Sequence, residues 1–181
     1  MRRSAWLWML PALVVLLAIG CSTAPKSRGE RIELNDGVRQ AIETARATDP
    51  DVTRFFNDSA GYAVFPSVGA AAVGVGGAYG QGEVFQNGRL IGYCTMTQAN
   101  IGFSFGGRKY TEFIFFQTPE ALDSFKSGNF AFSGQASAVA LLSGVSTNAK
   151  YADGVAVFTM GEKGLMVQAS LGGQKFSFKR G

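Results

Sequence analysis

Two short segments of the sequence combine residue types and spacings that could support chemistry. The segment Gly102 to Gly106 fits the G-x-S-x-G pattern, in which the serine acts as a nucleophile. Such a serine needs a strand-to-helix turn and a base, but the chain contains no histidine and the flanking residues continue as strand-like sequence. The acidic residues also show no paired spacing. We therefore expect no enzymatic activity, no bound metal and no cofactor.

The second segment, the glycine-rich stretch Val68 to Phe85, could hold a phosphate, act as a linker or form a strand. It lacks both the G-x-G-x-x-G spacing of a dinucleotide site and the Gly-Lys-Ser/Thr of a P-loop. Interleaved Val, Tyr and Phe residues disfavour a linker. Alternation instead predicts a strand with one bare face, which a helix, another strand or an acyl chain could approach closely. The bare face comprises Gly74, Gly76, Ala78, Gly80 and Gly82.

The amino terminus has the features of an export signal. Two arginines precede the apolar run Trp6 to Ile19, whose 14 residues are fewer than the ~20 that span a bilayer. Leu17 to Cys21 resembles the lipobox of bacterial lipoproteins, in which the cysteine becomes the acylated amino terminus. This resemblance implies a lipid anchor such as palmitate on Cys21. Because Ser22 rather than aspartate follows, it also implies the outer membrane, facing the periplasm. An ordinary signal peptide that contains a cysteine is the alternative.

The mature chain is expected to form one domain behind a tether. We expect residues 1–20 to be removed as the signal peptide, 21–31 to form a flexible tether and 32–181 to fold as a single domain. Removal of the signal leaves 15 basic and 13 acidic side chains, too small an excess to indicate a nucleic-acid partner. With Cys21 acylated, Cys94 has no disulfide partner, and we expect it to be buried.

Helical patterns occur at three places. Apolar residues at helical spacing predict an amphipathic helix over residues 36–48, and a second short helix is expected after Asp49-Pro50. Thr118 as cap, Pro119 in the first position and Gly128 after the end predict a helix between them.

The remainder reads as strands joined by short turns. Asn87-Gly88 predicts a hairpin with a type I′ turn. Further strands are expected over residues 110–117, 129–142, 155–160, 165–171 and 175–180, with a turn over residues 161–164. We therefore predict an α+β fold: an antiparallel, glycine-rich β-sheet, arranged as a sandwich or partly closed barrel, with an N-terminal amphipathic helix and one helix inserted between strands.

From about Asp51 onward the chain resembles the SYLF domain, also called the actin-binding domain of yeast cortical-patch proteins. The similar segments are "AGYAVFPSVGAAAVGVGGAYGQGEVF", "NGRLIGYCTMTQANIGFSFGGRKYTEFIFFQTPEALDSF" and "YADGVAVFTMGEKGLMVQASLGGQKF". Eukaryotic members bind phosphoinositides and actin, and bacterial members are exported lipoproteins. Here Ser59-Ala60-Gly61 replaces the lysine that many members carry before the glycine, and the amino-terminal segment is only weakly basic. The resemblance therefore implies phospholipid binding without phosphoinositide specificity, and an exported lipoprotein would not meet actin.

Two functions remain open at this stage. The domain could bind membrane phospholipid, or it could be a non-enzymatic protein-interaction or envelope-scaffold module. For lipid binding, strand alternation places Lys175 and Lys179 on one face, and Arg108 and Lys109 in a turn between strands could join them. A solvated strand edge protected by charge is the simpler explanation of the same lysines.

Overall fold

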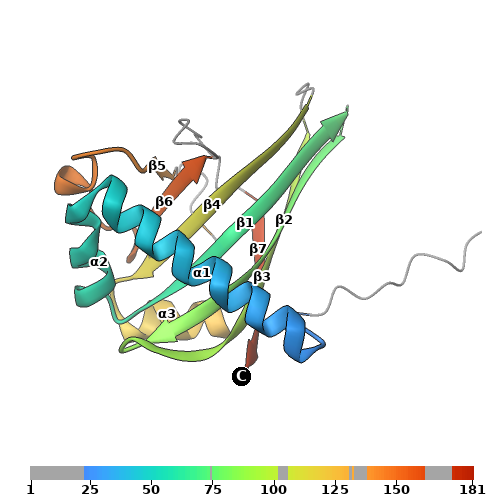
Figure 1. Cartoon of the computed structure of the whole chain (residues 1–181), viewed down its shortest axis with the longest axis horizontal. Coiled ribbons are helices and arrows are strands. Elements are labelled where there is room, and N and C mark those ends of the chain that lie inside the picture. Colours follow the sequence, from blue (N-terminus) through green and yellow to red (C-terminus); the bar gives the residue numbers. More distant parts are fainter. Residues whose placement is uncertain (1–22, 74, 102–105, 131, 133–137, 162–172) are drawn as a thin grey trace, which may run out of the picture.

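A single curled sheet with helices on both faces makes up the fold (Figure 1). The computed structural model describes residues 23–73, 75–101, 106–130, 132, 138–161 and 173–181. Within them, seven strands are ordered β5-β6-β4-β1-β2-β3-β7, and all neighbours are antiparallel except the short β5–β6 pair. The strands are β1 (Gly61–Val73), β2 (Val75–Gln86), β3 (Arg89–Ile101), β4 (Gly106–Phe116), β5 (Val139–Ala140), β6 (Val155–Gly161) and β7 (Gln174–Arg180). The predicted α+β class is confirmed; the sheet is neither a sandwich nor closed into a barrel across these residues.

The long helix α1 (Arg28–Thr48) begins eight residues earlier than the apolar pattern predicts. A capping box starts it: the Ser27 hydroxyl accepts from the Glu30 amide at 3.1 Å, and the Glu30 carboxylate accepts from the Ser27 amide at 3.5 Å. Residues 28–33 are all exposed, and this part of the helix carries no apolar periodicity. The end of the predicted tether, residues 28–31, therefore belongs to the helix.

One face of the sheet is covered by α1, a 3₁₀ turn η1 (Pro50–Val52) and the short helix α2 (Thr53–Asp58), as predicted for the segment after Asp49-Pro50. The helix α1 buries Val38, Ala41 and Ala45 there. The ring centroids of Phe56 and Phe115 are 4.8 Å apart, and α2 thereby packs on β4. A second 3₁₀ turn, η2 (Ser146–Asn148), lies beside η1.

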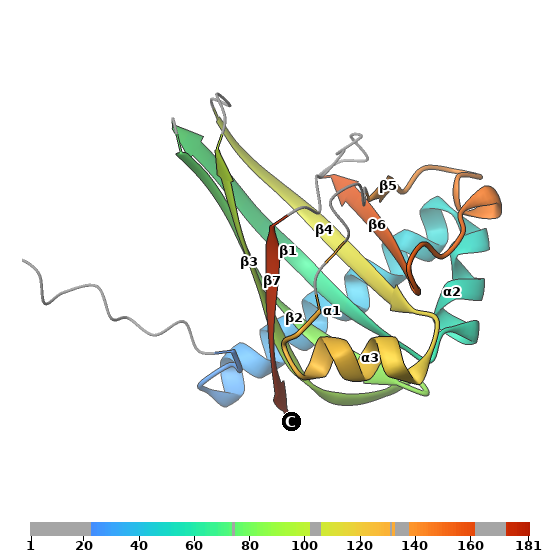
Figure 2. The same cartoon turned by 180° about the vertical axis from the view of Figure 1, so that it is seen from behind.

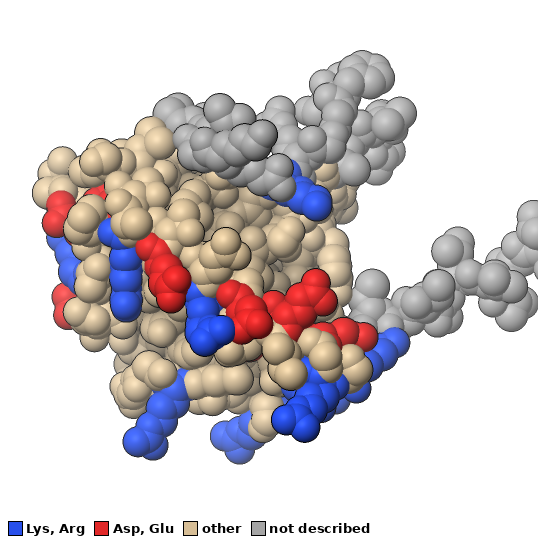
Figure 3. Space-filling view, in the orientation of Figure 1, with Lys and Arg blue, Asp and Glu red and all other residues tan. Residues whose placement is uncertain are grey.

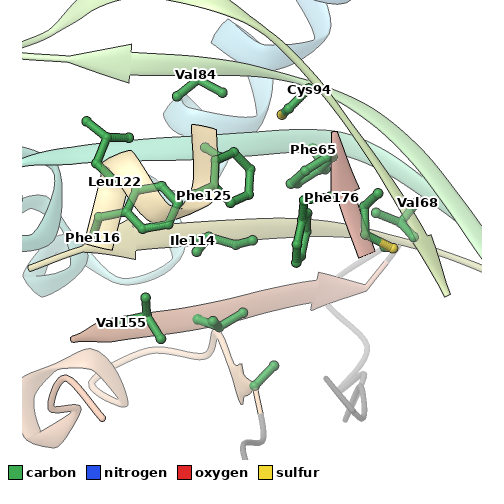
Figure 4. Close-up of a cluster of buried hydrophobic side chains, with 14 of the residues drawn as sticks. Phe65, Val68, Val84, Cys94, Ile114, Phe116, Leu122, Phe125, Val155 and Phe176 are labelled. Atoms are coloured by element: carbon green, nitrogen blue, oxygen red, sulfur yellow. The ribbon is translucent and has the colours of Figure 1, made fainter. Parts of the chain in front are cut away.

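The other face is concave and holds helix α3 (Pro119–Lys126), which Figure 2 shows from that side. As predicted, the Thr118 hydroxyl caps it, accepting from the Ala121 amide at 3.3 Å, and Gly128 follows with φ +75°. Leu122 and Phe125 point from α3 toward the strands (Figure 4). The Phe125 ring lies 5.0 Å from that of Phe176 on β7. The core of this face therefore joins α3 to the edge of the sheet.

The curl of the sheet follows from small residues on β2. If the sheet were flat, β4 and β7 would lie about 19 Å apart, at ~4.8 Å per strand. Side chains from these two strands are nevertheless in contact: Gln174 Nε2 on β7 lies 3.2 Å from Glu112 Oε2 on β4. On the concave face, Gly82 leaves room for the Phe65 ring and Gly80 leaves room for the Val68 side chain. The register of β1 also shifts between Val64 and Ser67, which bends the strand.

Several strand predictions need correction. The glycine-rich stretch forms the hairpin-connected strands β1 and β2 rather than one strand, and Gly74 between them lies outside the described residues. Gly106–Lys109 belongs to β4 and is not a turn. Of the strand predicted over 129–142, only β5 forms among the described residues, because Phe130 and Phe132 instead pack against Phe176 across the concave core.

The remaining predictions divide between confirmed and undescribed segments. The Asn87-Gly88 hairpin is confirmed, with φ of 51° and 72° at these residues. The strands predicted over 110–117, 155–160 and 175–180 are confirmed as β4, β6 and β7. The G-x-S-x-G serine, the strand 165–171 and most of the turn 161–164 lie outside the described residues.

The close contact on β2 gives a stability test. A Cβ on Gly82 would lie 2.4 Å from the Val64 carbonyl oxygen and 2.9 Å from the Phe65 ring. We expect Gly82→Ala to lower the free energy of unfolding by about 1–3 kcal/mol, because backbone must move to admit the methyl group. Denaturant unfolding measures the change.

Gly69→Ala is the matched control, since a Cβ there would meet no heavy atom within 4 Å. We expect it to leave stability unchanged or slightly higher. If both substitutions lowered the free energy of unfolding equally, the close approach of β1 to β2 at Gly82 would not be a constraint on the fold.

Candidate functional site

A groove of about 590 Å³ runs along one flank of α1, between the helix and the sheet. Its wall on α1 spans Glu30 to Thr44, about 21 Å at 1.5 Å per residue, so the groove is long and narrow. The floor is the irregular part of β1 at Pro66 and Ser67, where the register shift occurs. Gly37 lets the helix approach this floor, because a Cβ there would lie 3.4 Å from Pro66 Cβ.

Mixed chemistry lines the groove. Leu34, Ala41, Pro66, Tyr79 and Met160 supply apolar surface, and the lining side chains include neutral polar groups such as Gln40, Thr44 and Thr111. Among the described residues, the charged ones that line it are Glu30 and Glu33, at the amino-terminal end of α1. Tyr79 is 38% exposed, which is high for a large side chain on this sheet. The groove could therefore hold an extended ligand that has both apolar and polar groups.

A buried polar contact seats α1 beside this groove. Asn35 Nδ2 donates to Glu83 Oε2 at 3.3 Å, and Glu83 is 1% exposed on β2 under the helix. Burial raises the pKa of the Glu83 carboxyl, and the Asn35 hydrogen bond partly opposes that rise. The contact therefore joins α1 to β2 beside the groove.

Basic side chains gather along one end of the molecule. Figure 3 shows them in blue along the lower edge, below the acidic side chains of α1. In Figure 1 this edge contains the start of α1, the β2–β3 hairpin and the end of β7. The last strand meets the hairpin there, because the Gly181 amide donates to the Ile91 carbonyl at 3.2 Å. We call this surface the basic edge; its exposed residues are Lys26, Arg28, Arg31, Arg89, Lys179 and Arg180.

Two exposed aliphatic residues are next in sequence to arginines of the basic edge. Ile32 on α1 is 53% exposed and Leu90 on β3 is 41% exposed. With Tyr79 they are the large hydrophobic side chains recorded as exposed among the described residues. Each is next in sequence to an arginine, Arg31 and Arg89 respectively. The basic edge therefore combines positive charge with apolar groups that could enter a membrane interface.

The lysines predicted to contact lipid occupy two different places. The alternation of β7 is confirmed: Lys175 and Lys179 are exposed, whereas Phe176 is buried. Lys179 belongs to the basic edge. Lys175 instead shares a cross-strand row with Lys109 on the α1 face, through Thr97, Tyr79 and Gly69. Arg108 lies in β4, and its side chain is outside the described set.

The other predicted site residues are placed as follows. Gly80 and Gly82 pack against β1, as described above, and Gly76 and Ala78 lie on β2 with them. Cys94 is buried, as expected, and burial followed by the negative charges of Glu83 and Glu112 raises its pKa well above the ordinary range. Cys21 precedes the first described residue, Thr23.

Sequence patterns did not reveal the basic edge or the groove. Residues 26–31 had been assigned to the tether, and Arg89 and Arg180 only become neighbours through the β3–β7 pairing. The sequence signal that could have indicated the basic edge is the three-residue spacing of Arg28 and Arg31, which places both on one side of a helix. The described residues contain no group of acidic, cysteine or histidine side chains able to hold a metal ion. Nor does any helix in this part of the chain have the length and apolarity to cross a bilayer.

The seat of α1 can be tested at Asn35. Asn35→Ala removes the side-chain donor to Glu83, and we expect the free energy of unfolding to fall by about 1–3 kcal/mol because a buried carboxyl loses its partner. The neighbouring Asp36→Ala is the control: it removes only an ion pair with Arg39 whose side chains are 57% and 68% exposed. That loss should stay below about 0.5 kcal/mol. Indistinguishable effects would contradict this role for Asn35.

Comparison with known proteins gives one informative similarity. The chain is 28% identical over 158 residues to the Beta cell expansion factor A of Aeromonas veronii. The match covers 84% of this chain but 59% of that relative, so the chain spans little more than half the relative's length. No protein-family model matches the chain. The chain is therefore similar to a bacterial protein.

Proposed function

We propose that this protein is a membrane-anchored lipoprotein of the bacterial envelope whose SYLF-like domain binds phospholipid. The observation that carries the proposal is the basic edge, where six cations and two exposed aliphatic side chains share one end of the molecule. Cations near an anionic membrane surface contribute about 1 kcal/mol each, and aliphatic groups add binding by entering the interface. No acidic side chain lies in the hairpin segment 86–92 or in the last strand to weaken this attraction.

The position of the anchor supports the same orientation. The proposed acylation site, Cys21, is only five residues before Lys26, the first residue of the basic edge. Five residues span at most about 18 Å of extended chain. A lipid anchor at Cys21 would therefore hold the start of α1 close to the membrane, and the basic edge lies at that end. One lipid chain combined with a basic surface is a stable arrangement for membrane attachment.

The groove along α1 offers a place for part of a bound lipid. The apolar residues in its mixed lining and its length could accommodate an extended acyl chain, and it lies along the same helix that begins at the basic edge. The lipobox resemblance of Leu17 to Cys21 supports an envelope location. We propose this location as the outer membrane, with the domain facing the periplasm.

Charge reversal on the basic edge tests the proposal. We expect Lys179→Glu with Arg180→Glu to weaken flotation of the chain from Thr23 onward with phosphatidylglycerol-containing vesicles by at least tenfold, from ~1 kcal/mol for each cation lost. Both side chains are exposed at the end of β7, so the melting temperature should change little. Phosphatidylcholine vesicles measure the non-electrostatic part of binding.

Lys109→Glu with Lys175→Glu is the matched control. It changes the net charge equally, but these lysines are exposed on the α1 face away from the basic edge. We expect the control to bind at least several times better than the variant of the basic edge. If both double variants weakened vesicle binding equally, the effect would be one of general charge and would contradict the assigned surface. If neither the wild type nor the control bound the vesicles, a protein-interaction module would be favoured.

The anchor is tested separately at Cys21. In the full chain, Cys21→Ser removes the thiol that would be acylated, and we expect the protein to move from the membrane to the soluble periplasmic fraction. Mass spectrometry of the wild type should show acyl mass on Cys21. A wild-type protein without that mass would refute the lipoprotein assignment while leaving the vesicle result unaffected.

A further inference from the structure

A buried carboxyl and a buried amide meet inside the concave face, away from the groove and the basic edge. Glu112 on β4 is 0% exposed and Gln174 on β7 is 3% exposed. Gln174 Nε2 lies 3.2 Å from Glu112 Oε2 and donates to it. These two strands are separated in the sheet by β1, β2 and β3. The pair is therefore a direct contact across the curl.

The same two side chains leave two buried oxygens without a partner. Neither Glu112 Oε1 nor Gln174 Oε1 has a hydrogen-bond partner among the described residues. Both are acceptors when the glutamate is ionised, so neither can satisfy the other. A proton on Glu112 converts its carboxylate into a donor as well. A carboxylic acid and a primary amide can then form two hydrogen bonds, one in each direction, and both oxygens are satisfied.

The surroundings favour the neutral acid. Glu112 pairs in register with Phe65 on β1 and Thr159 on β6, which are uncharged. Two titratable groups are close enough for Glu112 to affect their pKa values, Tyr110 on β4 and Cys94 on β3. A negative charge on Glu112 raises the pKa of both. Toward this core, α3 presents Leu122 and Phe125, as Figure 4 shows. No described cation compensates a charge on Glu112, and no ion pair of the described residues includes it.

Burial also raises the proton affinity of the Glu112 carboxyl. Removal from water raises the pKa of the Glu112 carboxyl from its ordinary 4.5 to about 7, and the Gln174 hydrogen bond lowers it only in part. In an opened state the carboxyl regains water and its ordinary pKa. Between these two values the opened state loses the proton first, so closure becomes less favourable as pH rises. The contact is complete below about pH 4.5 and is weakened once pH passes about 7.

We propose that Glu112 is a neutral carboxylic acid in the closed protein, and that its pair with Gln174 is a pH-sensitive latch that holds β7 across the concave face to β4. Ionisation of Glu112 leaves a buried charge with one donor, and water entering between β7 and β4 then relieves it. The first residues of β7 are most affected, because Gln174 is the first residue of the strand. The latch does not depend on lipid binding.

Amide hydrogen exchange of the full chain at pH 5 and pH 8 tests the latch. After correction for the intrinsic exchange rates, we expect protection of Lys175 to Ser177 to fall by up to about a hundredfold at pH 8, from the separation of the two pKa values. Protection of the centre of β4 should change less. In Glu112→Gln the pair stays neutral at both values, so β7 should keep its protection.

Glu83→Gln is the matched control, because Glu83 is also buried but lies under α1 on the opposite face. This variant should retain the pH response of β7. A response that persists in Glu112→Gln, or one that disappears in Glu83→Gln, would overturn the latch. If Glu112→Gln does not fold, carboxyl ¹³C titration of the wild type decides: a Glu112 carboxyl already ionised at pH 5 would overturn the proposal.

Discussion

The contact of Phe65 with the glycine surface of β2 is the constraint on which the rest of the fold depends. A Cβ on Gly82 would lie 2.9 Å from the ring, and the nearby shift in register bends β1 at Pro66. This bend has a different result on each face. On the concave side it brings β7 opposite β4, so that Glu112 and Gln174 meet. On the α1 side it leaves the irregular floor over which the groove runs.

Features that depend on residues close together in the chain could be predicted from the sequence, whereas features that depend on distant residues could not. The Asn87-Gly88 hairpin and the capped helix α3 depend on residues close in the chain, and both were predicted. The division of the glycine-rich stretch into β1 and β2 was missed, because strand alternation continues through both segments. The start of α1 was missed because a capping box, not an apolar stripe, determines it.

The candidate site was less predictable because it is assembled from distant segments. Lys179 was identified from alternation alone, but its neighbours Arg89 and Arg180 depend on the pairing of β3 with β7, whose register sequence does not supply. Alternation correctly places Lys175 on the same face of β7 as Lys179, but only the strand pairing shows that Lys109 lies in a cross-strand row with Lys175 rather than with Lys179. The buried pair of Glu112 and Gln174 has no sequence signature either, since the two residues are 62 positions apart.

The first turns of α1 connect the two surfaces of the candidate site through helix geometry. At 100° per residue, Arg28 and Arg31 fall on one flank, whereas Glu30 and Glu33 lie about 100–160° around the helix from them. The acids line the groove and the arginines belong to the basic edge, as this spacing requires. A negatively charged membrane would attract one flank and repel the other. Such a membrane would therefore favour an orientation with the basic edge in contact and with Glu30 and Glu33 turned away from the anionic head groups.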